Sequence, residues 1–270
     1  MSANISAKDV MALRQRTGLG MMDCKEALTV NGGDMEKAVE WLRTKLKGKM
    51  DERAGRAMAQ GRLAIATSPD RKAVAIVEIN VETDFTARNE MVEKAANEIA
   101  SIALSGPTGD VAANDRITSI VDNIRITTGE NTVYRRGLKL VAICVGAYLH
   151  FDNQKAAVIT FDGEVDAEVA KGICMHIVSH VPTPQGVSDK DIPADIVSRQ
   201  RELAKQEAIE SGKPPEIAEK MVEGKIRKFL QEITLLDQKY VKDPEGKKSV
   251  KDVLPKGVTI TGFQRLEVGR

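Results

Sequence analysis

Aromatic side chains and cysteines are both scarce in this sequence of 270 residues. Aromatic residues make up 3% of the chain, so stacking platforms for nucleic acid bases would be few. The cysteines Cys24, Cys144 and Cys174 are odd in number, widely separated and without a C-x-x-C pair. Reduced thiols in the cytosol are the simplest interpretation, and we therefore expect a cytoplasmic protein.

The chain also lacks a large net charge of either sign and a long apolar run. Lys and Arg number 40 against 39 Asp and Glu, which gives no general attraction to nucleic acid or to an anionic membrane, although local basic patches remain possible. No apolar run approaches the roughly 18 residues that a membrane span needs. Residues 1–10 lack the basic start and apolar block of a secretory signal. The composition favours an ordinary soluble protein.

Motifs for enzyme chemistry are missing as well. There is no G-x-x-x-x-G-K-[ST] loop, no G-x-G-x-x-G after a strand and no G-x-S-x-G elbow. We therefore expect no bond chemistry, no cofactor and no nucleotide site in this chain. One metal site is conceivable, because His176 and His180 are four residues apart on a predicted helix. However, no carboxylate follows His176 as in H-E-x-x-H, and Cys174 would point about 200° away from it. Structural or interface histidines are the favoured interpretation.

Residues 1–46 predict a compact module of three short helices. Ser6 can cap the first helix, Gly18 stops it, and Asp34 can cap the third. Residues 47–60 are charged, interrupted by Gly and poor in large apolar side chains, which is typical of a linker.

Residues 61–140 and 141–270 predict two similar α+β subdomains with antiparallel sheets. Each begins with a hairpin pattern followed by helical patterns, at about 86–104 and 114–126 in the first subdomain. Residues 138–150 predict one long strand, and residues 257–269 predict a strand that completes the second sheet.

Residues 194–232 are highly charged and helical on both sides of Ser211-Gly212-Lys213-Pro214-Pro215. Gly followed by Pro ends one helix and starts the next, so this stretch predicts a projecting antiparallel helical hairpin. Its apolar positions are too sparse for a thick core. They include Ile196, Leu203, Ala204, Ile217, Met221 and Ile226.

Two stretches leave alternatives open on their residues alone. Phe85 follows a strand pattern and stands beside Asp84; the ring can pack on the core of the following helix, or it can be presented to another protein. Met21 and Met22 are adjacent and about 100° apart on a helix, so either one is displayed at an interface or both are half-buried.

Four segments closely resemble the family of bacterial elongation factor Ts, in the right order along nearly the whole chain. They are TGLGMMDCKEAL, TDFTARNEMV, SGKPPEIAEKMVEGKIRKFLQEI and TGFQRLEVG. The resemblance implies a guanine-nucleotide exchange factor for elongation factor Tu, which holds the GDP, GTP and magnesium itself. It also implies that the three-helix module is ubiquitin-associated-like and that neither a membrane nor nucleic acid is a direct partner.

The resemblance also assigns residues. A family T-D-F-V segment that contacts the GTPase and dislodges magnesium corresponds here to Thr83, Asp84, Phe85 and Thr86, with Thr86 in place of the usual Val. Further partner contacts correspond to Arg14, Met21, Met22, Lys25, His176 and Val241. Lys242 departs from the apolar residue usual after Val241.

Other classes of protein predict different behaviour. A helical adaptor would not change GDP release, a zinc enzyme centred on His176 and His180 would carry metal, and an RNA-binding factor would bind with a steep dependence on salt.

Overall fold

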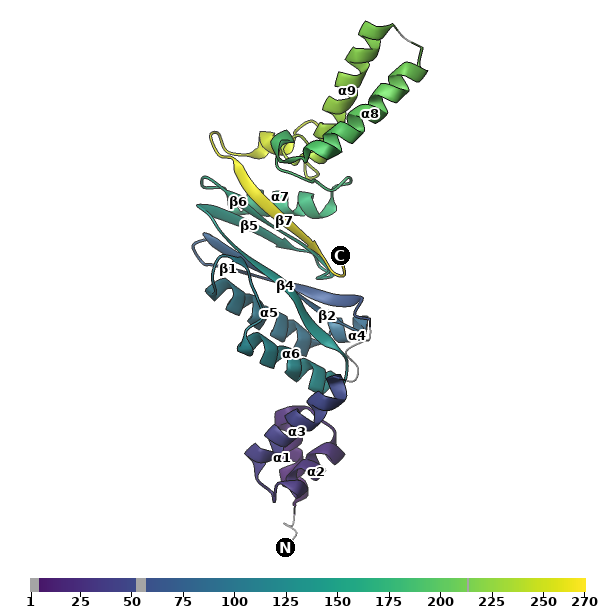
Figure 1. Ribbon diagram of the computed structural model, residues 1–270. Coiled ribbons are helices and arrows are strands. Elements are labelled where there is room, and N and C mark those ends of the chain that lie inside the picture. Colours follow the sequence, from purple (N-terminus) through teal and green to yellow (C-terminus); the bar gives the residue numbers. More distant parts are fainter. Residues whose placement is uncertain (1–4, 52–56, 213) are drawn as a thin grey trace. The chain divides into compact units, whose positions relative to one another are not determined.

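The computed structural model describes residues 5–51, 57–212 and 214–270, and its fold is α+β as predicted (Figure 1). Contacts divide the chain into two compact units. The first comprises the chain up to Ala66, Ala75–Lys139 and Val268–Arg270, and the second comprises Thr67–Val74 and Leu140–Glu267. Among the described residues, no helix is both long and apolar enough to cross a membrane.

The N-terminal module consists of α1 (Ala7–Thr17), α2 (Met21–Val30) and α3 (Met35–Asp51). The predicted caps are present: the Ser6 side chain accepts a hydrogen bond from the Asp9 amide, and Asp34 accepts from two amides at the start of α3. The core of the module is formed by Val10, Leu13, Leu19, Cys24, Ala27, Leu28, Ala38 and Leu42. Helix α3 continues five residues into the segment for which a linker was predicted, and residues 52–56 of that segment lie outside the described residues.

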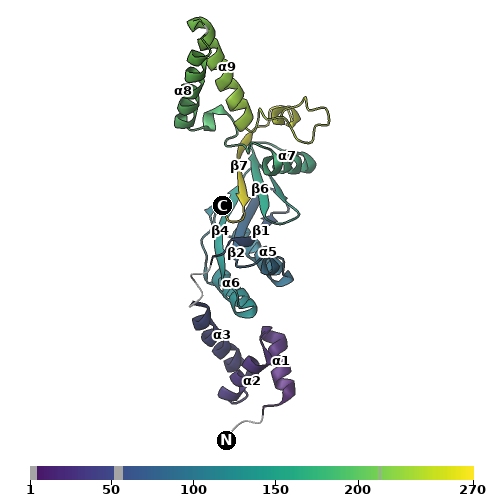
Figure 2. The same cartoon turned by 90° about the vertical axis from the view of Figure 1, so that its right-hand side faces the viewer.

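The first sheet has the strand order β1-β2-β4-β3. Its strands are β1 (Gln60–Thr67), β2 (Ala73–Val81), β3 (Gly109–Asp110) and β4 (Thr132–Val141). Helices α5 (Glu90–Ser105) and α6 (Asp115–Thr128) cover one face of this sheet (Figures 1 and 2). The single helix predicted at 86–104 is wrong in one respect: a one-turn helix, α4 (Asp84–Ala87), precedes α5, and Asn89 caps α5 separately.

The second sheet has the order β5-β6-β7. It is formed by β5 (Cys144–Leu149), β6 (Lys155–Phe161) and β7 (Ile260–Glu267), and α7 (Ala167–Ser179) packs on it. The prediction of one long strand over 138–150 is wrong, because the chain leaves the first sheet after Val141 and enters the second at Cys144. In both sheets a hairpin is followed by one or more helices and by a strand beside the second hairpin strand, as expected for two similar subdomains.

Helices α8 (Ala194–Glu210) and α9 (Pro215–Ile233) form the predicted hairpin, which we call the arm (Figure 2). Its thin core consists of Ala204, Ala208, Val222 and Ile226. Small alanines on α8 allow the two helix backbones to approach closely. Leu203 and Ile217, two of the sparse apolar positions of this stretch, are about half exposed. Short 3₁₀ turns lie at Asp189–Asp191 and Val250–Val253.

Candidate partner-binding surfaces

The turn formed by Thr83–Arg88, which we call the wedge turn, presents its aromatic ring to solvent. Thr83 has an extended backbone, and its hydroxyl accepts a hydrogen bond from the Thr86 amide at 3.3 Å, so it caps α4. Phe85 lies two residues after Thr83 and is 84% exposed. Of the two interpretations open for Phe85, packing on the core is therefore excluded. A Phe left this exposed displays a large apolar area for which water is a poor partner.

Of the other residues of the wedge turn, some face solvent and some are buried against the first unit. Asp84 is partly exposed and forms an ion pair with Arg88 at 3.3 Å. Thr86 and Ala87 are buried, at 8% and 5% exposure, and attach the turn to the first unit. Thr86 therefore has little surface to offer a partner, and its expected direct contact stays a prediction. A small polar residue in place of Val at this position therefore changes the support of the turn rather than the presented surface.

The N-terminal module presents a second surface at the start of α2. Met21 is 50% exposed and Met22 is 76% exposed, whereas neighbouring Leu19 is buried in the core of the module. Both methionines are therefore exposed to solvent, whereas the helical geometry required this of only one of them. Arg14 and Lys25 are also exposed. Exposed, flexible thioethers suit a protein interface.

His176 does not belong to any exposed surface of the described chain, and its expected contact with a partner stays a prediction. Its side chain is fully buried on α7. Nδ1 accepts a hydrogen bond from the Val241 amide at 3.2 Å, so the proton lies on Nε2, which donates to Oε1 of Gln238 at 2.9 Å. The Gln238 amide nitrogen donates to the carbonyls of Pro182 and Glu232, which fixes its orientation. His176 therefore positions the backbone at Val241.

Val241 itself presents a third surface, because its side chain is 46% exposed. Lys242 beside it is also exposed. Gly172 on α7 makes this placement possible: a Cβ there would collide with the Tyr240 hydroxyl, so the 240–242 segment packs directly on the helix.

The histidines and Cys174 do not form a metal site in the described part of the chain, where no group of three or more His, Cys, Asp or Glu side chains could hold an ion. Both ring nitrogens of His176 are occupied by protein groups. Burial lowers the pKa of His176 to about 4. The hydrogen bond to Gln238 raises this pKa, and the charge of nearby His180 lowers it. Burial raises the pKa of the Cys174 thiol well above its usual range, and a protonated thiol is a poor ligand.

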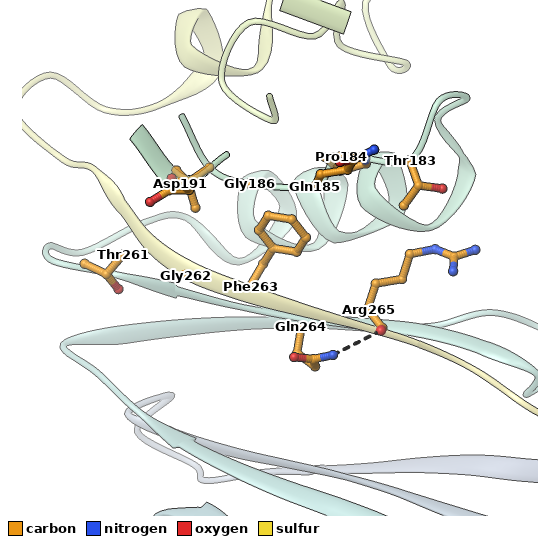
Figure 3. A pocket seen from close by; sticks show the side chains of 11 residues that line it. Thr183, Pro184, Gln185, Gly186, Asp191, Thr261, Gly262, Phe263, Gln264 and Arg265 are labelled. Atoms are coloured by element: carbon orange, nitrogen blue, oxygen red, sulfur yellow. Dashed lines mark hydrogen bonds between the residues drawn. The ribbon is translucent and has the colours of Figure 1, made fainter. Parts of the chain in front are cut away.

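A polar cleft of about 460 Å³ in the second unit lies between β7 and the segment 183–187 (Figure 3). Phe263 and Arg265 point from β7 toward this segment. The one carboxylate in its lining, Asp191, already accepts hydrogen bonds from the Ser188 amide and hydroxyl. Its lining includes neither histidine nor cysteine. The cleft therefore offers no nucleophile with a positioned base.

Two features of these surfaces escaped sequence reasoning. Phe151, in the turn between β5 and β6, is 86% exposed and contacts the ring of His150, with ring centroids 4.5 Å apart and ring planes tilted by 51°. Its position beside a polar Asp-Asn turn is the sequence signal that could have predicted an exposed ring. The second is Glu130, which binds Thr83 from 47 residues away. Local sequence carries no signal for a contact of that separation.

Exposed apolar side chains on three separate surfaces are typical of proteins that bind other proteins. A family model described as "Elongation factor TS" matches residues 82–270 of the chain. The chain is 42% identical to elongation factor Ts of Thioalkalivibrio sulfidiphilus, covering 98% of this chain and 92% of that relative. The corresponding protein of Hahella chejuensis is also 42% identical, covering 99% and 93%. That of Methylococcus capsulatus is 41% identical, covering 98% and 92%.

The chain belongs to the elongation factor Ts family, and it is therefore a translation elongation factor.

Proposed function

We propose that this chain is a guanine-nucleotide exchange factor that binds elongation factor Tu carrying GDP and accelerates release of the nucleotide. Membership of the elongation factor Ts family supports this partner and this activity. The single observation that carries the mechanism is the exposure of Phe85, at 84%, on a turn whose other face is buried. Exchange of this kind needs no bond chemistry in the factor.

Exchange follows from reciprocal coupling of two binding events. The factor binds the nucleotide-free partner more tightly than the GDP-bound partner, and it must then weaken GDP binding by the same ratio. The interaction that distinguishes the two states of the partner therefore drives the release. Phe85 supplies such an interaction if its ring can be accommodated only after the partner's elements near the phosphate site have shifted.

Asp84 acts beside the ring. Its carboxylate is held by Arg88 in an exposed pair, which costs little to break. Near the partner's nucleotide site, this carboxylate disfavours the arrangement of magnesium and phosphate. Magnesium demands near-ideal octahedral coordination, so displacement of its ligands lowers its affinity. Loss of the ion leaves the diphosphate less neutralised, and GDP dissociates faster.

The remaining surfaces supply affinity. Met21 and Met22 form one contact region, to which the exposed Arg14 and Lys25 of the same module can add, and Val241 forms another. Together with the wedge turn they suit an interface well above about 1,000 Å², which a specific complex requires. His176 contributes by holding Val241 in place.

The test replaces Phe85 by Ala. We expect the maximal rate of GDP release to fall by about tenfold or more, because a central aromatic contact commonly contributes about 2 kcal/mol and about 1.4 kcal/mol corresponds to a factor of ten. Affinity for the nucleotide-free partner, in which the ring is accommodated, should fall as well, whereas affinity for the GDP-bound partner should change much less. Stopped-flow release of a fluorescent GDP analogue and titrations of the nucleotide-free and the GDP-bound partner measure these quantities.

Phe151→Ala is the matched control, because Phe151 is an equally exposed ring on a different turn. This control should leave the maximal release rate unchanged. If the F85A variant promotes GDP release as fast as the wild-type chain, the proposed role of Phe85 is refuted.

A further inference from the structure

The wedge turn cannot hold its own conformation. Helix α4 has four residues, and one helical turn is unfavourable in isolation because its nucleation orders several residues for a single hydrogen bond. Its apolar anchor is small, consisting of Thr86 and Ala87. The large side chain, Phe85, points away from the protein and contributes nothing to holding the turn. Other groups must therefore fix the backbone that presents it.

Glu130 fixes the N-terminal end of the turn. Its Oε1 accepts a hydrogen bond from the Thr83 hydroxyl at 2.7 Å, and its Oε2 accepts one from the Thr83 amide at 3.1 Å. The same hydroxyl accepts from the Thr86 amide, so Glu130 also orients the cap of α4. The neighbouring residues form a second pair: Glu82, which precedes Thr83, accepts a hydrogen bond at 2.6 Å from the amide of Asn131, which follows Glu130. Two neighbouring pairs thus bind the start of the wedge turn to the loop after α6.

Arg62 fixes the C-terminal end. Its Nη1 donates to the Ala87 carbonyl at 3.3 Å, and its Nη2 lies 3.0 Å from a carboxylate oxygen of Glu93 on α5. The Arg62 side chain is only 9% exposed, whereas that of Glu93 is 48% exposed. A buried guanidinium needs partners for its charge and its donors. The carbonyl that ends α4 is one of these partners.

We propose that Glu130 and Arg62 are positioning residues for exchange: together they hold the wedge turn in the conformation that presents Phe85 and Asp84 to the partner. Preorganisation of this kind removes an ordering cost that the complex would otherwise bear when the ring is inserted. Glu130 accepts from a backbone amide at the start of the turn and Arg62 donates to a backbone carbonyl at its end, so each charged group binds a backbone group of matching polarity. This proposal rests on the function proposed above and extends it to residues that do not touch the partner.

The kinetic test uses the full chain with Glu130→Ala and Glu130→Gln. For E130A we expect the maximal rate of GDP release to fall by about tenfold while the half-saturating concentration of the factor rises by less than about threefold, because the affinity surfaces elsewhere are untouched. E130Q keeps one acceptor oxygen and should lie between E130A and the wild type. Glu98→Gln is the control, since Glu98 is an exposed carboxylate whose ion pair, with Arg116, does not involve a residue of the turn. It should release GDP at the wild-type rate.

A double-mutant cycle separates positioning from a general structural effect. If Glu130 acts through Phe85, then E130A should slow release by less than about twofold in a chain that already carries F85A. A general loss of structure would slow release equally in both backgrounds and would overturn the proposal. Arg62→Met tests the other end of the turn, and its effect should also disappear in the F85A background.

Hydrogen exchange on the free chain tests, without a partner, whether Glu130 holds the wedge turn in place. In E130A the amides of residues 83–88 should exchange about tenfold faster or more, while peptides from α5 and α6 keep their wild-type protection. Unchanged exchange in the wedge turn would overturn the positioning role. Faster exchange combined with a normal release rate for F85A would instead overturn the proposed function, and with it any part of Glu130 in exchange.

Discussion

Two residues with the same expected role, contact with a partner, have opposite environments. Phe85 is almost fully exposed because its neighbours Thr86 and Ala87 take the buried face of a single helical turn. His176 is fully buried, and both of its ring nitrogens are bound within the protein. The ring of Phe85 can therefore act on another molecule. The imidazole of His176 instead binds the backbone amide of Val241 and the side chain of Gln238.

The burial of His176 predicts a pH dependence of stability. Its pKa is about 4 in the folded chain and near 6.5 in the unfolded chain, so protonation favours the unfolded state. The stabilising contribution of the neutral ring is complete above about pH 6.5 and is lost as the pH falls toward 4. The free energy of unfolding should decrease across this window by up to about 1.4 kcal/mol per pH unit from this group. Denaturant titrations at pH 7.5, 6 and 5 measure it.

His176→Gln serves as the comparison, because Gln can accept from the Val241 amide but does not titrate. This variant should be less stable than the wild type at pH 7.5, and the difference between the two should narrow as the pH falls. A difference that stays constant from pH 7.5 to 5 would show that His176 is not the titrating group.

Sequence predicted residue roles where the interaction is local and missed them where it is distant. The caps at Ser6 and Asp34 involve amides within three residues, so the pattern of residue types was sufficient. The burial of His176 depends on Gln238 and Val241, which are 62 and 65 residues away. No local pattern records such contacts. The exposure of Phe85 was open for the same reason, since it depends on which face of α4 meets the core.

At the scale of elements, boundaries were predicted where a breaker residue marks them. The arm turns at a Gly-Lys-Pro-Pro run, and α8 and α9 lie on either side of it. The break between α4 and α5 has only Arg88-Asn89, and the transfer of the chain from the first sheet to the second has only Ala142-Ile143. Neither pair contains Gly or Pro. Continuous helical and strand patterns were therefore predicted across both breaks.

The arm supports a prediction about which of its interactions hold it together. Ile226 is 4% exposed in the small arm core, and Ile226→Ala should destabilise the arm by about 2–4 kcal/mol through lost burial and a cavity. Glu223 pairs with Arg201 across the two helices on an exposed face, and Glu223→Gln should cost less than about 1 kcal/mol. Hydrogen exchange of peptides from α8 and α9 compares the two variants.

Peptides from β5–β7 provide the internal reference for that measurement and should keep their protection in I226A. Equal effects of the two substitutions would mean that ion pairs, and not the thin apolar core, stabilise the arm.

At the scale of the whole molecule, separate apolar cores support separate tasks. The N-terminal module, the first sheet with its helices, the second sheet with α7 and the arm each enclose their own buried cluster. The net charge of +1 supplies no long-range steering toward a charged partner. Affinity must therefore come from contacts distributed over these parts, and each part should contribute independently.

Removal of residues 1–51 tests this independence. The shortened chain should keep its fold, because the cores around both sheets are formed by residues outside the N-terminal module, and its circular dichroism should lose only the signal of α1–α3. Affinity for elongation factor Tu should fall, while the maximal rate of GDP release should change little because Phe85 remains. Replacing both Met21 and Met22 by Ala in the full chain should reproduce part of the affinity loss, as these are the apolar side chains that the module exposes at the start of α2. A collapse of the dichroism of the remaining chain would contradict the domain boundary, and an equal fall in maximal rate would mean that the module takes part in the release step itself.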